Sequence, residues 1–253
     1  MEIDLNADLG EGFGAWSMGD DEGLLRFVTS ANVACGFHAG DPSVIDRTVS
    51  LALRAGVAIG AHPSYYDLRG FGRRAITADP SEVEADVLYQ LGAVAAFARA
   101  HGGRLAHVKP HGALYNQAAA DEALAQAVAR AVARFDPSLV FVGLASSPVM
   151  RRAAESQGLR FAGEAFADRR YEADGTLVSR RAAGALIEGP AEAAAQAVRI
   201  AREHAVAARD GSSVALDAAT LCLHGDAPGA VANARAVREA LDAAGVVVRA
   251  LAR

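Results

Sequence analysis

The chain has 253 residues, of which 25 are Lys or Arg and 30 are Asp or Glu, so its formal net charge is −5. Hydrophobic residues make up 52% of the chain, a composition that excludes disorder over most of its length. The mild acidity argues against a dedicated nucleic-acid-binding protein, which would present a basic surface.

The predicted elements alternate between helices and short apolar runs. A capping residue, often followed by proline, opens each helix, and glycine closes most of them. The six predicted helices span residues 41–56, 79–103, 121–135, 147–158, 189–211 and 229–245. Eight apolar runs typical of strands buried on both faces span residues 3–5, 31–35, 57–60, 105–108, 139–143, 159–162, 220–223 and 246–251.

Strands that alternate with helices at this spacing predict parallel βαβ units. Seven or eight such units with no linker between them predict one domain over residues 1–253, a closed or nearly closed (β/α) barrel of mainly parallel strands. A doubly wound open sheet is the alternative, because the pattern does not fix the order of the strands.

Nothing in the sequence indicates export or a membrane. Met1 is followed directly by Glu2, Ile3 and Asp4, without an apolar leader segment. The chain has no uninterrupted apolar stretch of about 18 residues. Cys35 and Cys222 lie in apolar stretches and are expected to be buried thiols in a reducing compartment. We therefore expect a cytoplasmic protein.

Polar residues follow the apolar runs, at the ends where a parallel barrel builds its active site. Five of the seven histidines lie at these ends. Taken singly, each histidine could be structural, but their position after successive strands predicts one shared site. His107 lies just inside its strand and could equally be a core histidine, and Asp41 is most simply a helix cap. The candidate site residues are Asn6, Asp8, His38, His62, Lys109, His111, Tyr115, Glu164, Asp168, Arg169, His224 and Asp226.

Lys109 is the only lysine of the chain and directly follows a buried apolar run. At that position we expect it to bind an anionic group or an oxyanion, or to tune a neighbouring carboxylate. Because there is one lysine, and it does not follow a Gly-x-x-x-x-Gly pattern, a phosphate-binding P-loop is excluded. The motifs of dinucleotide-binding folds, serine hydrolases of the α/β-hydrolase type and structural zinc sites are also missing.

Nine segments spread along the chain resemble the LamB/YcsF family. They are IDLNADLGEGFG (3–14), SANVACGFHAGDP (30–42), GVAIGAHPSY (56–65), GFGRR (70–74), HVKPHGALYN (107–116), EAFADRRY (164–171), DGTLVSR (174–180), GALI (184–187) and LCLHGD (221–226). Their order and their spread from end to end are far more specific than any single motif.

This resemblance implies a distorted TIM-like barrel related to glycoside hydrolases and deacetylases. It also implies hydrolysis of the lactam 5-oxo-L-proline to L-glutamate, coupled to hydrolysis of ATP with Mg, in a complex with two further 5-oxoprolinase subunits, B and C. Because this chain has no P-loop, ATP could bind to it or to its partners. Two other functions stay open: a metal-dependent deacetylase or amidohydrolase that needs no ATP, and a non-catalytic scaffold.

Lactam hydrolysis requires a base for water, an acid for the ring nitrogen and donors for developing negative charge. We expect Asp8 or Glu164 as the base and His111 or His38 as the proton donor. The expected catalytic set is Asp8, Lys109, His111, Glu164, Asp168 and Arg169, where Lys109 and Arg169 stabilise the phosphate or oxyanion. The expected substrate-binding set is Asn6, His38, His62, Tyr115, His224 and Asp226. Kinship with deacetylases makes Asp8, His38 and His62 candidate ligands of a divalent metal ion.

Overall fold

The computed structural model describes residues 1–180, 182–187, 189–225 and 229–252. Eight of its strands form the main sheet: β1 (Glu2–Leu9), β2 (Ser30–Ala34), β3 (Ala58–His62), β4 (Leu105–Val108), β5 (Val140–Leu144), β6 (Arg160–Phe166), β9 (Thr220–Leu223) and β10 (Val247–Val248). The strand order is β10-β1-β2-β3-β4-β5-β6-β9, and a further pairing of β1 with β9 closes the ring. Seven parallel strands therefore make a closed barrel, to which β10 adds at β1, so the predicted barrel is confirmed and the open sheet is excluded.

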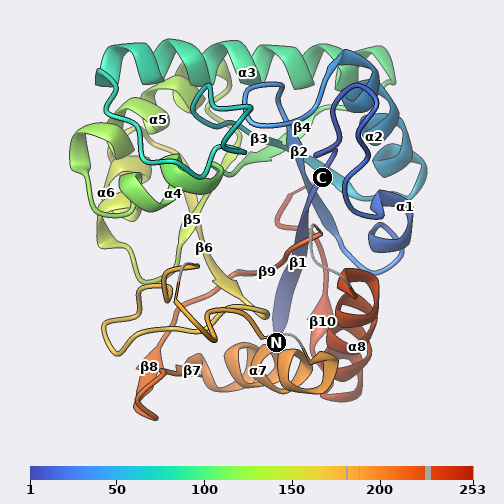
Figure 1. The fold of residues 1–253 in the computed structure, drawn as a ribbon, viewed down its shortest axis with the longest axis vertical. Helices are drawn as coiled ribbons and strands as arrows, with labels where there is room; N and C mark the ends of the chain where they lie inside the picture. Colours follow the sequence, from blue (N-terminus) through green and yellow to red (C-terminus); the bar gives the residue numbers. More distant parts are fainter. Residues whose placement is uncertain (181, 188, 226–228, 253) are drawn as a thin grey trace.

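Helices surround this ring of strands (Figure 1). They are α1 (Asp21–Leu24), α2 (Pro42–Arg54), α3 (Pro80–Ala100), α4 (Gly112–Ala118), α5 (Glu122–Phe135), α6 (Pro148–Ser156), α7 (Pro190–Glu203) and α8 (Ala230–Ala243). The predicted caps are present: Oδ1 of Asp41 accepts hydrogen bonds from the backbone N–H groups of Ser43 and Val44 at the start of α2. Asp79, Asp121 and Ser147 cap α3, α5 and α6 in the same way.

One predicted helix is too long. Residues 189–211 are expected to be helical, but α7 ends at Glu203, where His204 adopts a left-handed conformation with φ of 51°. The chain then forms an antiparallel pair of strands, β7 (Ala205–Ala207) and β8 (Ser213–Ala215). Alanine is a strong helix former, so the alanine-rich segment carries no signal for this end. The short helices α1 and α4 are not among the predicted elements.

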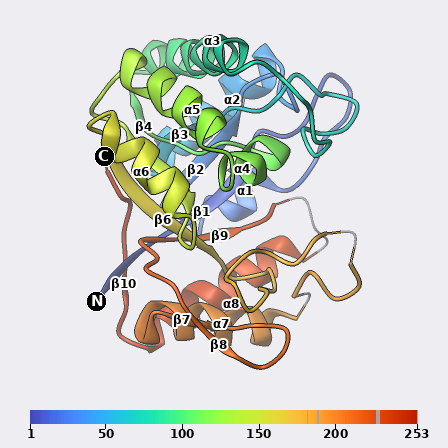
Figure 2. The same ribbon diagram turned by 90° about the vertical axis from the view of Figure 1, so that its left-hand side faces the viewer.

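The inside of the barrel is apolar at one end and polar further along its axis. At the end where the strands begin, Val140, Val142 and Ala162 pack with Leu251 and Ala252. Figure 2 shows both chain termini on the left of the view, the N-terminus beside β10 and the C-terminus nearer to α6. Residues two apart on a strand share a face, so the apolar residue 162 and the acidic residue 164 of β6 both point into the barrel. Glu164 therefore lies further along the axis than Ala162, toward the carboxyl end of β6. No helix in the described ranges has the length and apolar character needed to cross a membrane.

Candidate active site

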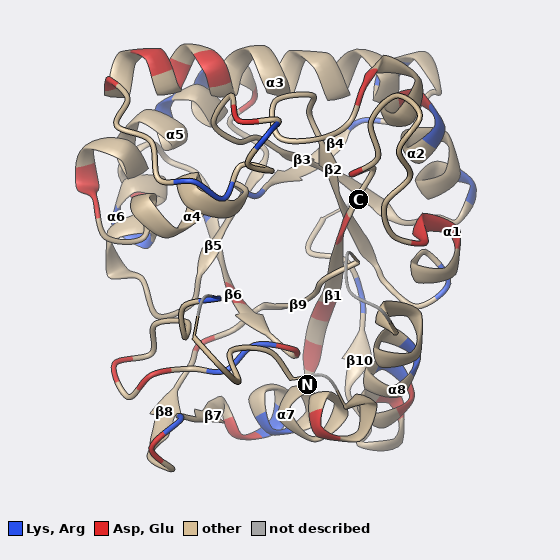
Figure 3. Cartoon of the chain, viewed as in Figure 1, with Lys and Arg blue, Asp and Glu red and all other residues tan. Residues whose placement is uncertain are grey.

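Polar side chains of β1 fill the middle of the barrel. The Nδ2 group of Asn6 donates to Glu164 Oε1 at 3.1 Å and to Thr220 Oγ1 at 2.7 Å, and its Oδ1 accepts from Asn32 at 2.7 Å. Asn6 and Asp8 were expected to follow the first strand, and Glu164 to follow the sixth. The structure corrects this, because all three lie within their strands with their side chains pointing inward. Figure 3 shows the acidic residues along β1.

His107 belongs to this middle layer. Its Nε2 lies 2.8 Å from Asn32 Oδ1, and the side chain is buried in the barrel beside Gly60. A Cβ on Gly60 would clash with the imidazole, so the absence of a side chain there makes room for it. His107 is therefore a core histidine beneath the site, one of the two interpretations that its position in the sequence allowed.

Lys109 lies between two carboxylates at the end of β4. Its Nζ is 2.9 Å from Asp8 Oδ1, 2.9 Å from Glu164 Oε1 and 3.0 Å from Cys222 Sγ. Burial alone would lower the pKa of the Lys109 ammonium, but Asp8, Cys222 and Glu164 outweigh burial and raise that pKa well above its ordinary value. Burial would likewise raise the pKa of the Asp8 carboxyl, yet His62 and Lys109 hold it well below its ordinary value. Lys109 and Asp8 are therefore both charged.

Two histidines each point one ring nitrogen at the other. The Nδ1 of His62 lies 2.7 Å from the carbonyl oxygen of Lys109, and the Nε2 of His111 lies 2.9 Å from that of Phe71. Because a carbonyl only accepts, these two nitrogens carry protons. In the neutral rings, the lone pairs would be on His62 Nε2 and His111 Nδ1, which are 3.0 Å apart. Carbonyl partners commonly fix the tautomer of metal-binding histidines in this way.

Two carboxylates complete this cluster. Asp8 Oδ2 lies 3.3 Å from His62 Nε2, and Glu11 Oε1 lies 3.8 Å from His111 Nδ1. One ligand atom from each of these four residues falls within 4.8 Å of the others. Two imidazole nitrogens and two carboxylate oxygens make a donor set that suits zinc or manganese. The residues present therefore fit a divalent ion; we call Asp8, Glu11, His62 and His111 the His–carboxylate cluster.

This set differs from the expected ligands Asp8, His38 and His62. The ring of His38 instead stacks on His111 with centroids 3.7 Å apart, and its Nε2 lies 3.4 Å from Glu11 Oε1. Burial in the first place lowers the pKa of both His38 and His111 well below the ordinary value, which keeps the imidazoles neutral. The sequence analysis missed Glu11 as a site residue, although it stands in the polar segment that follows β1.

A second pair of ionisable residues lies on the β6 and β9 side of the barrel mouth. Asp168 accepts from the backbone N–H of His224 at 2.9 Å, and both of its oxygens lie 2.9 Å from His224 Nδ1. Burial would raise the pKa of Asp168, but His224 outweighs burial and lowers it. The Phe166 ring stacks on His224 with centroids 5.6 Å apart. The carboxylate thus orients the imidazole through Nδ1 and leaves Nε2 available for proton transfer.

The two sides meet at Asp8. Ligand atoms of Asp8, Cys222 and His224 also fall within 4.8 Å of one another, so His224 belongs to the same site as Lys109. Tyr115, on α4, is buried against Phe166, and its pKa is raised well above the ordinary value by burial and by the charge of Glu164. Arg169 directly follows Asp168 in sequence. Asp226, expected to bind substrate, lies outside the described residues.

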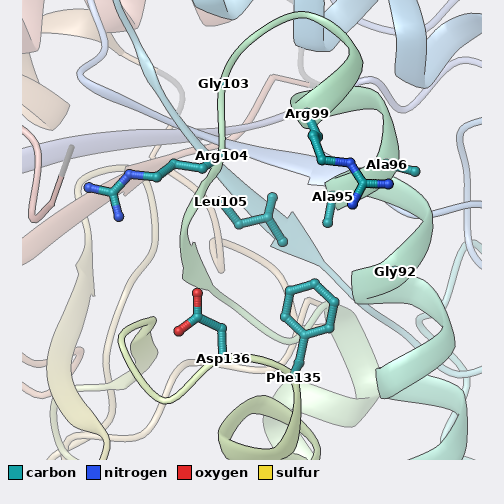
Figure 4. Close-up of a pocket in the computed structure, with 9 residues that line it drawn as sticks. All are labelled: Gly92, Ala95, Ala96, Arg99, Gly103, Arg104, Leu105, Phe135 and Asp136. Carbon is teal, nitrogen blue, oxygen red and sulfur yellow. The ribbon is translucent and has the colours of Figure 1, made fainter.

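The segment between β3 and α3 covers the site. Phe71 has a φ of 55°, unusual for a residue with a side chain, and its ring packs edge-on against His38 and His111. The site side chains are accordingly almost all buried. A cavity of about 320 Å³ lies elsewhere, between α3 and α5 beside Leu105, which is the first residue of β4 (Figure 4). That cavity is at the opposite end of β4 from Lys109 and has no part in the site.

Comparison with known proteins agrees with this arrangement. The model of the LamB/YcsF family matches residues 3–253. The chain belongs to the LamB/YcsF family. Its relatives include a 5-oxoprolinase subunit of Methylococcus capsulatus, 59% identical with 98% of this chain and 95% of that protein covered. The protein of the same name from Chloroflexus aggregans is 56% identical, with 98% of both chains covered.

A solved structure is similar over nearly the whole chain. It is a lactam utilization protein from Thermus thermophilus, 51% identical, with a TM-score of 0.94, and the match covers 99% of this chain and 100% of that one. The barrel described above is therefore also the fold of a crystallised relative.

Proposed function

We propose that this chain is the lactam-hydrolysing subunit of an ATP-dependent 5-oxoprolinase, which converts 5-oxo-L-proline to L-glutamate. The observation that carries the proposal is the 59% identity, over 98% of the chain, to a protein named as a 5-oxoprolinase subunit. The buried site adds groups that amide hydrolysis requires: carboxylates, a fixed ammonium and an oriented imidazole.

Lys109 supplies positive charge where negative charge develops. The ammonium is held by Asp8 and Glu164 and keeps its proton, so it cannot serve as a base. A preorganised cation in a site shielded from water stabilises an oxyanion or a transferred phosphate strongly. Glu164 and Asp8 in turn fix the position of the ammonium.

His224 is the best placed group for proton transfer to the ring nitrogen. Asp168 holds its Nδ1, in the relation that orients catalytic histidines generally. His111 and His38 were the donors expected from the sequence, but burial lowers the pKa of both, and a neutral imidazole is a weak acid. We therefore assign acid–base chemistry to the Asp168–His224 pair.

The His–carboxylate cluster would hold a divalent metal ion through Asp8, Glu11, His62 and His111. Such an ion, when bound, lowers the pKa of a water molecule and polarises carbonyl oxygens. The protein residues contribute the fixed tautomers, with Lys109 O and Phe71 O as the acceptors that set them.

Coupling to ATP addresses the stability of the substrate. Closure of a five-membered lactam benefits from effective molarities of about 10⁵–10⁸ M, so the ring resists hydrolysis. The lack of a P-loop leads us to place ATP with Mg wholly or partly on two further subunits, B and C. We also propose a cytoplasmic location, since Cys35 and Cys222 are both free and buried, as thiols are in reducing compartments.

The test is release of glutamate from 5-oxo-L-proline and ATP, measured with and without the two partner subunits. The critical variant is Lys109→Arg, which keeps the charge but replaces a compact ammonium by a larger planar group. Because Lys109 is packed against Asp8 and Glu164, we expect at least a 100-fold loss of activity with complex assembly intact. Lys109→Ala is a poorer choice, since two buried carboxylates without their cation would destabilise the fold by about 3–5 kcal/mol. Near-normal activity of the arginine variant would remove Lys109 from catalysis.

One observation favours a second function, a metal-dependent amidohydrolase that needs no ATP. This observation is the His–carboxylate cluster. Activity of the isolated chain that is lost with a chelator and indifferent to ATP would establish this alternative. If the activity of the complex survives both Lys109→Arg and His224→Gln while the complex still forms, the chain is a scaffold.

A further inference from the structure

Arg169 is a buried cation without a counter-charge among the described residues. It follows β6 and is 6% exposed. Its Nη2 donates to the carbonyl oxygen of Val178 at 2.7 Å, while its Nε is buried with no hydrogen-bond partner in the described parts of the chain. Over those same parts, no carboxylate forms an ion pair with its guanidinium.

The charges of the described neighbours compensate Arg169 only in part. Asp168 is the adjacent carboxylate, but its two oxygens are engaged by the backbone and ring N–H groups of His224. Arg180 lies close enough to act on Arg169 with a second positive charge. Burial and then Arg180 lower the pKa of Arg169 to about 10, so the guanidinium still carries its charge at neutral pH. A buried charge without a partner is costly, and such a charge is kept where a ligand supplies the opposite one.

Arg169 also lies next to the reacting groups. Arg169 directly follows Asp168, the residue that holds His224, and its pKa responds to Asp168 and Cys222. Cys222 Sγ is 3.0 Å from Lys109 Nζ. Asp168 holds His224, and ligand atoms of His224, Cys222 and Asp8 lie within 4.8 Å of one another. An anionic group bound to Arg169 would therefore lie on the same side of the barrel mouth as the Asp168–His224 pair.

We propose that Arg169 binds the carboxylate of the lactam substrate and so selects acidic lactams over neutral ones. This inference rests on the proposed function, and it names the part of the substrate that the β6 side of the mouth recognises. Guanidinium groups pair with carboxylates through parallel N–H donors, which a lysine cannot reproduce. One guanidinium, whose Nε has no partner in the part of the chain that the structure describes, matches the single charge of a carboxylate better than the three terminal oxygens of a phosphate.

The carboxylate of 5-oxo-L-proline is attached to the ring carbon next to the nitrogen. Anchoring it at Arg169 holds the lactam nitrogen and carbonyl at a fixed offset from the guanidinium, on the side where Lys109 and His224 lie. Arg169 would thereby contribute to orientation as well as to affinity.

The test compares binding of an acid with binding of its neutral analogue. Dissociation constants of 5-oxo-L-proline, 5-oxo-L-prolinamide and inorganic phosphate are measured by calorimetry on the full chain and on the Arg169→Met, Arg169→Lys and Arg170→Met variants. Arg170→Met is the matched control, because Arg170 is the next residue and pairs with Glu192 at the surface. Melting temperatures, taken in parallel, identify a variant that does not fold.

We expect Arg169→Met to weaken binding of the acid about 10- to 150-fold, the range for losing a charged hydrogen-bond partner. Binding of the amide should change less than about threefold, and Arg170→Met should resemble the unmodified chain. Arg169→Lys should lose affinity for the acid only, by about 10-fold, which keeps the test valid if the methionine variant does not fold.

Equal weakening for acid and amide would overturn the inference and indicate a purely structural arginine. The absence of any weakening, or of any binding of the acid, would overturn it as well. Loss of phosphate binding alone would overturn it and indicate a phosphate site. The glutamate-release assay separates these failures from failure of the proposed function. If glutamate is released but the Arg169 variants have no selective effect, only the proposed carboxylate site is wrong. If the Arg169 variants affect binding selectively but no glutamate is released, only the proposed reaction is wrong.

Discussion

The two sides of the barrel mouth carry opposite kinds of chemistry. On the side of β1, β3 and β4, two carboxylates and two imidazoles with converging lone pairs form a set of donors suited to a cation. On the side of β6 and β9, the buried Arg169 is suited to bind an anion, and the Asp168–His224 pair is suited to transfer a proton. Lys109 joins the two, since its ammonium contacts Asp8 from the first side and Glu164 from the second.

The difference follows from what each set of strands contributes. The Nδ1 of His62 and the Nε2 of His111 on the first side meet carbonyl oxygens, which fix the tautomer that a metal ligand requires. On the second side the Nδ1 of His224 meets the Asp168 carboxylate instead, which orients the ring for proton transfer through its other nitrogen. The same residue type thus serves as a ligand on one side and as an acid–base group on the other.

The largest expected effect concerns the second side. Asp168→Asn keeps the shape, but its amide N–H would face His224 Nδ1 and shift the ring proton to Nε2. We expect kcat to fall between about 100- and 10,000-fold, the range for a general acid–base group, with little change in KM. Steady-state glutamate release measures this. Asp217→Asn, at an exposed carboxylate paired with Arg151, is the control and should be fully active. A fall in both variants, or in neither, would contradict the assigned role.

A second test separates the two sides by their affinity for metal. His62→Gln removes one ligand of the His–carboxylate cluster, and we expect affinity for zinc or manganese to fall by more than about 100-fold, since even residues that only orient ligands account for 10- to 100-fold. Titration of the chelator-treated chain measures it. His224→Gln is the matched variant and should bind metal as the unmodified chain does. If His224→Gln is the variant that loses the metal, the ion belongs instead to Asp8, Cys222 and His224.

Most of the barrel could be predicted from the sequence, because alternating helices and apolar runs leave few arrangements other than parallel βαβ units. The lengths of β1 and β6 could not. Asn6, Asp8 and Glu164 look like residues that follow a strand, since the usual inside of a barrel is apolar, whereas this barrel has a polar middle layer. Where the barrel interior is polar, an apolar run marks only the first part of its strand.

The site was predicted in outline for the same reason: the ends of parallel strands must meet. The contacts between site residues could not be predicted. Those of Lys109 with Asp8, Glu164 and Cys222 each span more than 50 residues, and they depend on which strands face each other across the ring. Cys222 stands in an apolar run, where its sequence context indicates only a small hydrophobic residue. Glu11 lies three residues beyond Asp8 and carries no signal of its own, since the carbonyl partners that reveal a ligand set become visible only in the fold.

The smallest expected effect concerns the polar layer that both sides share. Burial, first, and then Lys109 and His62 lower the pKa of His107 to about 3, against about 6.5 in an unfolded chain. Between pH 6.5 and pH 3 the unfolded chain therefore binds a proton that the native chain does not. The free energy of unfolding is therefore not reduced by this residue above pH 6.5. Below pH 6.5 it falls on acidification, by up to about 1.4 kcal/mol per pH unit.

The variant His107→Gln isolates this contribution, because an amide can still donate to Asn32 Oδ1 but does not titrate. Urea unfolding at pH 7, 6 and 5 should show a shallower loss of stability in the variant, by about 1 kcal/mol per pH unit. Parallel curves for the two chains would mean that His107 is hydrated in the folded state. The polar layer beneath the site would then contain water. Because water raises the local dielectric constant, the ion pairs of Lys109 with Asp8 and Glu164 would be weaker than in a dry layer.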